Sequence, residues 1–197
     1  MALGLGLSLG AHGIIPDVSA PTIVPATTGM TTDATWTVAA GQQTSLASST
    51  VASVKILGTF APSDTGMILE QGASMSGLVV YVFGGTLYFQ CGSGASAGPD
   101  TSRAFIQHTL ASTTELIEFS ASASNGRAAL YVDGLLVGTD TFSASTLAGS
   151  DVGGVGRVYS GAAANFGGWT SDGSGVFSGT IDSAEIYLGE VTADVSS

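Results

Sequence analysis

Residues 78–91 read LVVYVFGGTLYFQC, two apolar runs separated by Gly84-Gly85. Val, Tyr, Phe and Leu favour β-strands, and paired glycines readily adopt the positive φ angles of a two-residue turn. The stretch therefore predicts a β-hairpin with strands over 78–83 and 86–91. Its last residue is the only cysteine of the chain, Cys91. In an apolar strand this thiol is expected to be a small buried hydrophobe rather than a nucleophile.

A second hairpin is predicted around Asp133-Gly134, one of the best two-residue turns, which separates the apolar runs 127–132 and 135–139. No segment has convincing helical periodicity, since Gly, Ser and Thr interrupt every window of sufficient length. Many short strands with tight turns and no helix are typical of a sandwich or barrel. The remaining strands are predicted over 35–39, 51–60, 67–71, 115–121 and 180–188.

Two motifs resemble a known superfamily. Residues 127–138, RAALYVDGLLVG, resemble the LYVDGxxVG hairpin of laminin-G-like and concanavalin A-like domains, and residues 177–187, FSGTIDSAEIY, are similar to their closing strand. The segment 66–72, GMILEQG, is similar to their early strands. The resemblance covers residues 35–190 and implies an all-β, two-sheet antiparallel jelly-roll sandwich. That superfamily includes lectins, glycan hydrolases, adhesion modules and viral structural proteins, so the fold alone does not determine function.

The first 33 residues differ from the rest. The opening MALGLGLSLG is apolar but lacks the preceding Lys or Arg of a secretory signal, and it is too short to span a bilayer. Pro16, Pro21 and Pro25 then favour extended chain. We therefore predict an extended N-terminal arm over 1–33 and a β-sandwich domain over 34–197. The alternative is that the arm forms an edge strand of the sandwich. As assembly contacts of the arm we expect Leu3, Leu5, Leu7, Leu9, Ile14 and Ile15.

The composition excludes some partners. Hydrophobic residues make up 44% of the 197 residues but charged residues only 10%, and the net charge is −11. The four cations, Lys55, Arg103, Arg127 and Arg157, are scattered, so neither nucleic acid nor an anionic membrane is an expected partner. A surface of Ser, Thr, Ala and Gly suits packed assemblies and extracellular settings, although it could also be a compositional habit of the organism.

The sequence argues against an enzyme. Paired carboxylates must flank a glycosidic bond, but Glu115 and Glu118 are three residues apart and would face opposite sides of a strand. The two histidines, His12 in the arm and His108, have no nucleophile motif beside them, and His108 is expected on the surface or in a loop.

No cofactor is expected. The few His and Cys residues are spread too widely for a transition-metal site. Calcium ligands could come from Asp64, Asp100, Asp151 and Asp172, but none lies in a dense acidic loop, and such residues more often bond their own backbone in turns. Asp133 and Asp182 fit the fold motifs, and we expect structural roles for them, in a turn and in a strand-edge bond.

Two functions follow from these patterns. The first is a non-enzymatic bacteriophage virion structural protein, for example a capsid decoration, cement or tail-fibre protein. Its arm would bind neighbouring subunits of a homo-oligomer and the major capsid or tail protein. The second is an extracellular carbohydrate-binding or host-adhesion module for surface glycans. It would use the long Gly-rich connection 156–179, and the aromatic candidates there are Tyr159, Phe166 and Trp169. These aromatics could instead cover the open side of the core.

Overall fold

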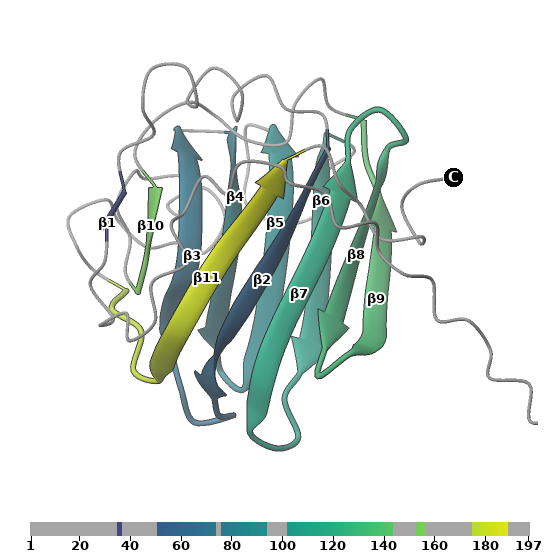
Figure 1. Ribbon diagram of the computed structural model, residues 1–197. Helices are drawn as coiled ribbons and strands as arrows, with labels where there is room; N and C mark the ends of the chain where they lie inside the picture. The colour runs from purple at the N-terminus through teal and green to yellow at the C-terminus, as the bar shows by residue number, and fades with distance from the viewer. Residues whose placement is uncertain are drawn as a thin grey trace, which may run out of the picture.

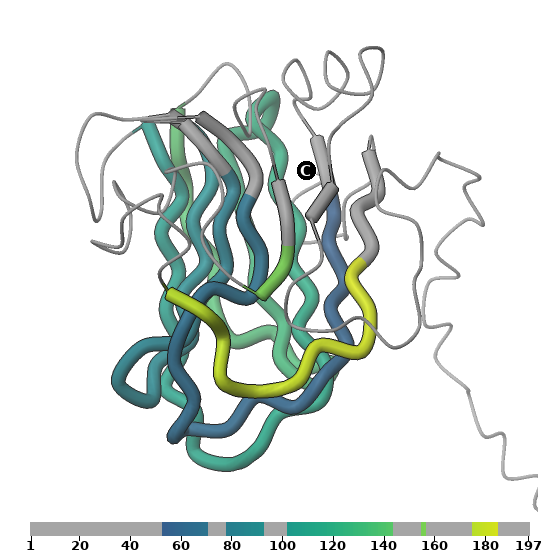
Figure 2. Tube along the Cα trace, turned by 90° about the vertical axis from the view of Figure 1, so that its left-hand side faces the viewer, coloured from purple at the N-terminus to yellow at the C-terminus, as the bar shows by residue number. Residues whose placement is uncertain are grey.

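The computed structural model describes residues 35–36, 51–73, 76–93, 102–143, 153–156 and 175–188 (Figure 1). Within these ranges the chain contains strands and turns but no helix, and therefore no helix that could cross a membrane. The strands form two antiparallel sheets that lie as two layers (Figure 2). The predicted all-β, two-sheet sandwich is confirmed. The arm, and residues 157–174, which include Tyr159, Phe166 and Trp169, lie outside the described residues.

The first sheet, called sheet A here, has six strands in the order β1-β10-β3-β4-β5-β6. Its strands are β1 (Thr35–Trp36), β3 (Gly66–Ala73), β4 (Ser76–Phe83), β5 (Thr86–Ser93), β6 (Arg103–Thr109) and β10 (Gly153–Val155).

Sheet B has five strands in the order β11-β2-β7-β8-β9. Its strands are β2 (Val51–Phe60), β7 (Thr114–Ser122), β8 (Arg127–Val132), β9 (Leu135–Thr141) and β11 (Thr180–Leu188).

Both predicted hairpin turns are confirmed. Gly84 and Gly85 have φ angles of 59° and 76°, and Asp133 and Gly134 have 48° and 78°. Positive φ at both central residues is the geometry whose twist matches that of the flanking strands. The Asp133 carboxylate Oδ1 also accepts hydrogen bonds from the backbone N–H groups of Glu115 and Leu116, at 3.0 and 2.9 Å. The expected structural role of Asp133 is therefore confirmed, and the turn is tied to the start of β7.

Two strands were not predicted from the sequence. Strand β6 pairs with β5 along its whole length, and the three-residue β10 joins β1 to β3. Strand β11 contains a register shift between Ile181 and Ser183, which explains why its apolar residues follow a period of two only in part. Such a bulge places one extra residue in one strand and reverses the alternation beyond it.

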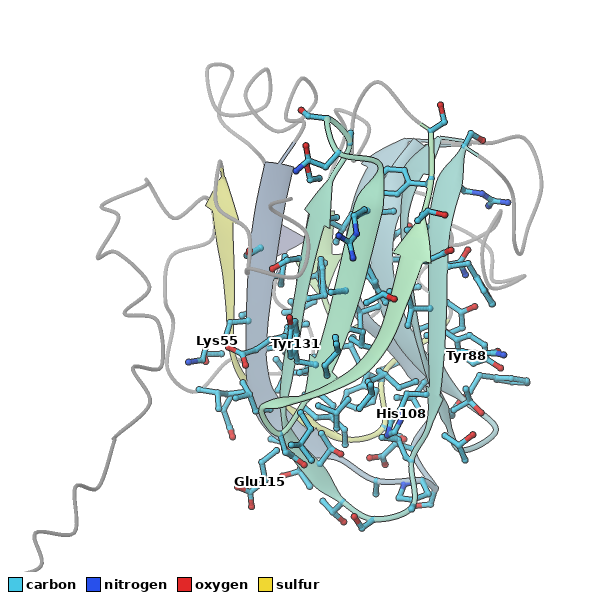
Figure 3. The ribbon with its side chains drawn as sticks, turned by 90° about the vertical axis from the view of Figure 1, so that its right-hand side faces the viewer. Lys55, Tyr88, His108, Glu115 and Tyr131 are labelled. Carbon is cyan, nitrogen blue, oxygen red and sulfur yellow. The ribbon has the colours of Figure 1, made fainter. Side chains whose placement is uncertain are left out.

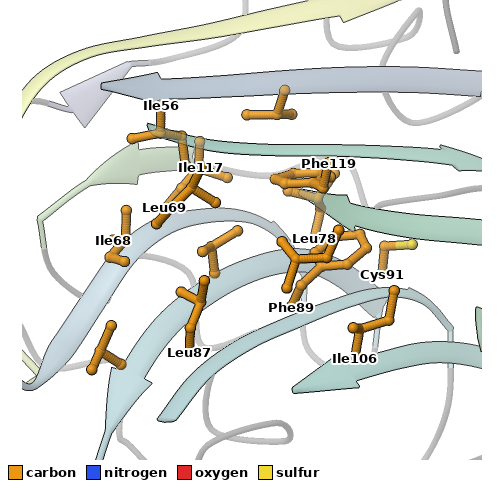
Figure 4. Packing of buried hydrophobic residues seen from close by; sticks show 14 of the residues in the cluster. Ile56, Ile68, Leu69, Leu78, Leu87, Phe89, Cys91, Ile106, Ile117 and Phe119 are labelled. Atoms are coloured by element: carbon orange, nitrogen blue, oxygen red, sulfur yellow. The ribbon is translucent and has the colours of Figure 1, made fainter. Parts of the chain in front are cut away.

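The hydrophobic core lies between the two sheets (Figure 4). Phe89 from sheet A and Phe119 from sheet B stack across it, with ring centroids 4.1 Å apart. Cys91 is buried in the same cluster, as predicted. Burial, with a smaller contribution from the charge of Asp140, raises the pKa of its thiol far above the usual value. This thiol is therefore protonated and unreactive at neutral pH.

The chain segment before β11 lies against the start of β3. Met67 and Val176 form a parallel bridge, and the Met67 N–H donates to the Gly175 carbonyl at 2.8 Å. Gly66 sits at this crossing with a φ of 116°, and an added Cβ would collide with the Val176 carbonyl oxygen. The close approach of the two backbones therefore requires glycine at position 66.

We predict that Gly66→Ala destabilises the domain more than Gly84→Ala does. Both glycines have positive φ; at Gly84, in the left-handed helical region, alanine should cost about 1 kcal/mol of backbone strain, and at Gly66, whose φ of 116° lies beyond that region, at least as much. Nothing lies within 4 Å of a Cβ placed at Gly84. The collision at Gly66 should add about 2 kcal/mol, measured as the difference in free energy of unfolding by urea titration. Equal losses for the two variants would show that the crossing is not tightly packed.

Candidate functional site

The outer face of sheet A, directed away from the core, carries an aromatic cluster. Side chains alternate along a strand, so core residues such as Val82, Leu87 and Ile106 are flanked by residues that point outward. The register places these outward residues in rows across the three strands β4, β5 and β6. The rows are Phe83–Thr86–Thr109, Tyr81–Tyr88–Gln107 and Val79–Gln90–Phe105.

Three aromatic side chains of this cluster reach the surface. Phe83 is 59% exposed, and Tyr88 and Phe105 are half-buried. Thr86, Gln107 and Thr109 lie beside them and are at least partly exposed. Figure 3 shows Tyr88 on the side of the molecule opposite Lys55. The name aromatic face is used below for Phe83, Thr86, Tyr88, Phe105, Gln107 and Thr109.

The rings of the aromatic face are held in place by packing. Tyr88 stacks on the buried Tyr81, with centroids 4.6 Å apart and planes inclined by 11°. On β6, Phe105 lies 6.1 Å from Tyr88 at a tilted 51°. Aromatic pairs at such distances stabilise each other by about 0.5–1.5 kcal/mol beyond their burial. Tyr88 therefore has a defined orientation before any ligand arrives.

Buried polar side chains lie next to the aromatic face in the same outward layer of sheet A. The Gln90 Nε2 group donates a hydrogen bond to the Tyr81 hydroxyl at 3.1 Å. Glu70, Gln90 and Arg103 are all fully buried. Burial raises the pKa of Tyr81 to about 12, an effect that the Gln90 hydrogen bond partly offsets. Tyr81 thus carries a neutral hydroxyl and supports the Tyr88 ring from the neighbouring strand β4.

The aromatic face is also anchored at the edge where the two sheets meet. The Phe105 N–H donates to the Asp140 Oδ2 of β9 at 2.7 Å. Nearby, Gly138 lets β9 approach Ile106, because a Cβ there would lie 2.5 Å from the Ile106 Cγ2. This contact fixes β6, an edge strand of sheet A, on the edge strand of sheet B.

The structure tests several residues that the sequence singled out. His108, which was expected on the surface or in a loop, lies within strand β6 rather than in a loop, and it is half-buried and so partly exposed at the surface. Asp64 is a turn residue, as expected, since its Oδ2 accepts the Ala61 N–H at 2.7 Å and its Oδ1 accepts the Ser178 hydroxyl at 3.1 Å. Asp182 is exposed beside the bulge of β11, and its predicted strand-edge bond stays a prediction.

Glu115 is exposed at the start of β7, and Glu118 is half-buried further along the strand. Ile117 and Phe119 face the core, so Glu118 points outward. Glu115 is an even number of residues from Ile117 and Phe119, so the two glutamates face opposite sides of the strand, as predicted. No group of three metal-ligating side chains occurs in the parts of the chain that the structure describes. Of the other calcium candidates, Asp100, Asp151 and Asp172 lie outside those parts, as do the six arm residues Leu3, Leu5, Leu7, Leu9, Ile14 and Ile15.

The aromatic face was not predicted from the sequence, although the residues that β4 and β5 contribute to it could have been recognised. Tyr81 and Phe83 alternate on one strand, and Thr86 and Tyr88 alternate on the next. Reading the outward side of the hairpin would have found these four residues together. The remainder could not be found, because residues 103–109 were not recognised as a strand.

Comparisons with known proteins reveal the fold but no family. No protein-family model matches the sequence, and no curated protein matches it. The solved structures similar to this chain include the NanB sialidase of Streptococcus pneumoniae, with a TM-score of 0.58, 14% identity, and coverage of 86% of this chain and 26% of the sialidase. Another is the CBM40 of the Ruminococcus gnavus IT-sialidase, bound to α2,6-sialyllactose. It has a TM-score of 0.52 and 11% identity, and the match covers 88% of this chain and 93% of the CBM40 chain.

A third similar structure is botulinum neurotoxin type C, whose cell entry depends on interaction with two ganglioside molecules. It gives a TM-score of 0.53 and 11% identity over 79% of this chain and 36% of the toxin chain. The present chain thus spans about a quarter of the sialidase, about a third of the toxin, and nearly all of the carbohydrate-binding module. At these identities the likeness establishes a shared β-sandwich fold, which the resemblance to concanavalin A-like domains had implied.

We predict that the free energy of unfolding falls between pH 10 and pH 12 more steeply in the wild type than in Tyr81→Phe. The unfolded chain releases the Tyr81 proton near its ordinary pKa of 10.0, whereas the folded protein holds it to about 12. In that window the unfolded state binds fewer protons, so stability decreases as pH rises. Phenylalanine has no proton to release. Urea titrations at several pH values measure both slopes, and identical slopes would show that Tyr81 is accessible to water.

Proposed function

We propose that this domain is a non-catalytic carbohydrate-binding module and that it binds glycans on the aromatic face. The observation that carries the proposal is the exposure of Phe83, Tyr88 and Phe105 beside Gln107 on the outer face of a rigid sheet. Soluble domains seldom leave several aromatic rings together on one surface without a binding partner.

The chemistry of the aromatic face suits a sugar. A pyranose ring has C–H groups that pack against aromatic rings, and its hydroxyls need hydrogen-bond donors and acceptors around them. Amide and hydroxyl groups of Gln107, Thr86 and Thr109 can supply both. Binding sites of this kind combine aromatic contact area with a few fixed polar groups that orient the ligand.

The rigidity of the site favours binding. Tyr88 is already stacked on Tyr81, and Phe105 is tied to Asp140 through its backbone. Side chains that are ordered before binding lose little conformational entropy when the ligand arrives. Strands also hold such groups more accurately than loops do.

The similar structures support this proposal over a virion structural role. They include a carbohydrate-binding module bound to sialyllactose and a toxin that interacts with gangliosides. The virion role rests on the arm, which lies outside the described residues, and it stays a prediction from the sequence. Glycan binding would place the domain where surface glycans are accessible, whether on a virion or outside a cell.

The absence of catalysis is part of the proposal. A glycosidase needs two carboxyl groups on either side of one bond. Glu115 and Glu118 face opposite sides of β7, so they cannot flank one bond. Strand β7 also belongs to sheet B rather than to the sheet with the aromatic face. Asp140 is engaged by the Phe105 backbone at the edge of that face.

A glycan array followed by titration calorimetry on the best oligosaccharide tests this function. Tyr88→Ala and Phe105→Ala should each weaken binding by roughly tenfold or more, because buried aromatic contacts dominate such interfaces. The matched control is Leu135→Ala, which removes an apolar side chain that is 71% exposed on β9 of the other sheet. That variant should bind as the wild type does.

Two results would contradict the assignment to this face. One is binding that survives both aromatic substitutions in variants with unchanged circular dichroism. The other is loss of binding in Trp169→Ala alone, which would move the site to the connection 156–179, where Tyr159, Phe166 and Trp169 are the aromatic candidates in the sequence.

A further inference from the structure

We infer that the glycan bound on the aromatic face is neutral, an oligosaccharide without carboxylate or sulfate groups. The inference rests on the proposed function and specifies its ligand class. It also separates this chain from the similar structure that is bound to sialyllactose, since sialic acid carries a carboxylate.

The positive charges that the structure describes are absent from the accessible part of the aromatic face. Lys55 and Arg127 lie on sheet B, in β2 and β8, and Figure 3 shows Lys55 on the far side of the molecule from Tyr88. Their neighbours along the strand, Val54 and Ala128, belong to the core, so both cations point outward from that other sheet. Arg157, the fourth cation, is outside the described residues.

Arg103 is the one described cation on the same side of sheet A, and it is not available to a ligand. It is two residues before Phe105 on β6, so its side chain also points outward, about 7 Å along the strand. However, its side chain is fully buried and already takes part in interactions within the protein. Because the side chain is fully buried, a ligand at the surface of the aromatic face does not reach the Arg103 guanidinium unless the chain around it moves.

A carboxylate, rather than a cation, lies at the edge of the aromatic face. The Asp140 Oδ2 is 2.7 Å from the Phe105 nitrogen. The whole chain carries a net charge of −11. An anionic sugar would lose part of its hydration at this face and gain no charge-assisted hydrogen bond in return. It would also be repelled by the field of the protein.

The accessible polar groups match a ligand that has only hydroxyl groups. Gln107 offers both a donor and an acceptor, and Thr86, Thr109 and Tyr88 offer hydroxyls. The exposed rings extend from Phe83 on β4 to Phe105 on β6, two strand spacings or about 10 Å across the strands, and four residues or about 13 Å along them. That width suits at least two linked sugar units rather than a monosaccharide.

The test compares neutral and acidic forms of one sugar on the full chain. Lactose and α2,6-sialyllactose form a matched pair that differs by the sialic acid, and an array of neutral, sialylated and sulfated oligosaccharides extends the comparison. We expect binding among the neutral glycans and a loss of about tenfold or more when an acidic group is added. Affinity for the neutral ligand should change little between low salt and about 0.5 M sodium chloride, because no charge pair is screened.

A charge added to the face provides a second readout. Gln107→Lys should raise the affinity for acidic glycans relative to their neutral forms by about threefold or more, since a cation then lies among the rings. Thr139→Lys is the control, because it makes the same change in net charge at an exposed position of β9 in sheet B. This control should leave the ratio of the two affinities close to that of the wild type.

The outcomes separate this inference from the function on which it rests. Tighter, salt-sensitive binding of sialylated or sulfated glycans by the wild type would overturn the neutral-ligand inference and leave carbohydrate binding in place. An equal change of ratio in Gln107→Lys and Thr139→Lys would place the ligand elsewhere on the domain. A folded wild type that binds no glycan on the array would overturn both.

Discussion

The stack of Phe89 on Phe119 joins the two sheets, and the outer faces depend on it. Because side chains alternate along a strand, inward placement of Phe89 forces Tyr88 and Gln90 outward. Residues paired across neighbouring strands point to the same side of the sheet, so Tyr81 on β4 and Phe105 and Gln107 on β6 also point outward. A slip of one residue would send the apolar set to the surface, so the core strongly specifies the register. The aromatic face is thus a consequence of how the core is packed.

The two outer faces of the sandwich have different characters. On sheet A, the aromatic rings contact one another, and the buried Gln90 lies beside Phe105 in the same outward layer. On sheet B, Lys55 pairs with Glu118 in the register, and the exposed apolar side chains are the aliphatic Leu57, Leu135 and Leu136. Exposed aliphatic residues are ordinary on protein surfaces, whereas ordered and clustered aromatic rings are not. This difference is why we propose sheet A, rather than sheet B, as the binding side.

The same fold can present very different chemistry to a ligand. The sialidases and toxin that resemble this chain share the sandwich at identities of 14% or less, a level at which surface residues need not correspond. Here the surface contains few charges of either sign and an excess of carboxylates. Because recognition depends on the groups that the sheet presents, a common architecture is compatible with ligands of opposite charge preference.

Much of the fold was predictable because it is encoded locally. The dipeptides Gly84-Gly85 and Asp133-Gly134 by themselves predict two-residue turns with positive φ angles, and the apolar runs around them indicate the strands. Such information is contained in a few adjacent residues. These signals, with the absence of helical periodicity, determined an all-β sandwich and a buried Cys91.

The aromatic face was decided by tertiary structure. Strand β6 has no strong turn signal of its own, and it becomes a strand by pairing with β5 and by the contact of Phe105 with Asp140. Only that pairing brings Phe105 and Gln107 beside Tyr88. Strand β10, with two glycines among its three residues, likewise owes its conformation to β1 and β3. Strand propensity depends on cross-strand neighbours, which are distant in the sequence, and so the site could not be read from its own residues.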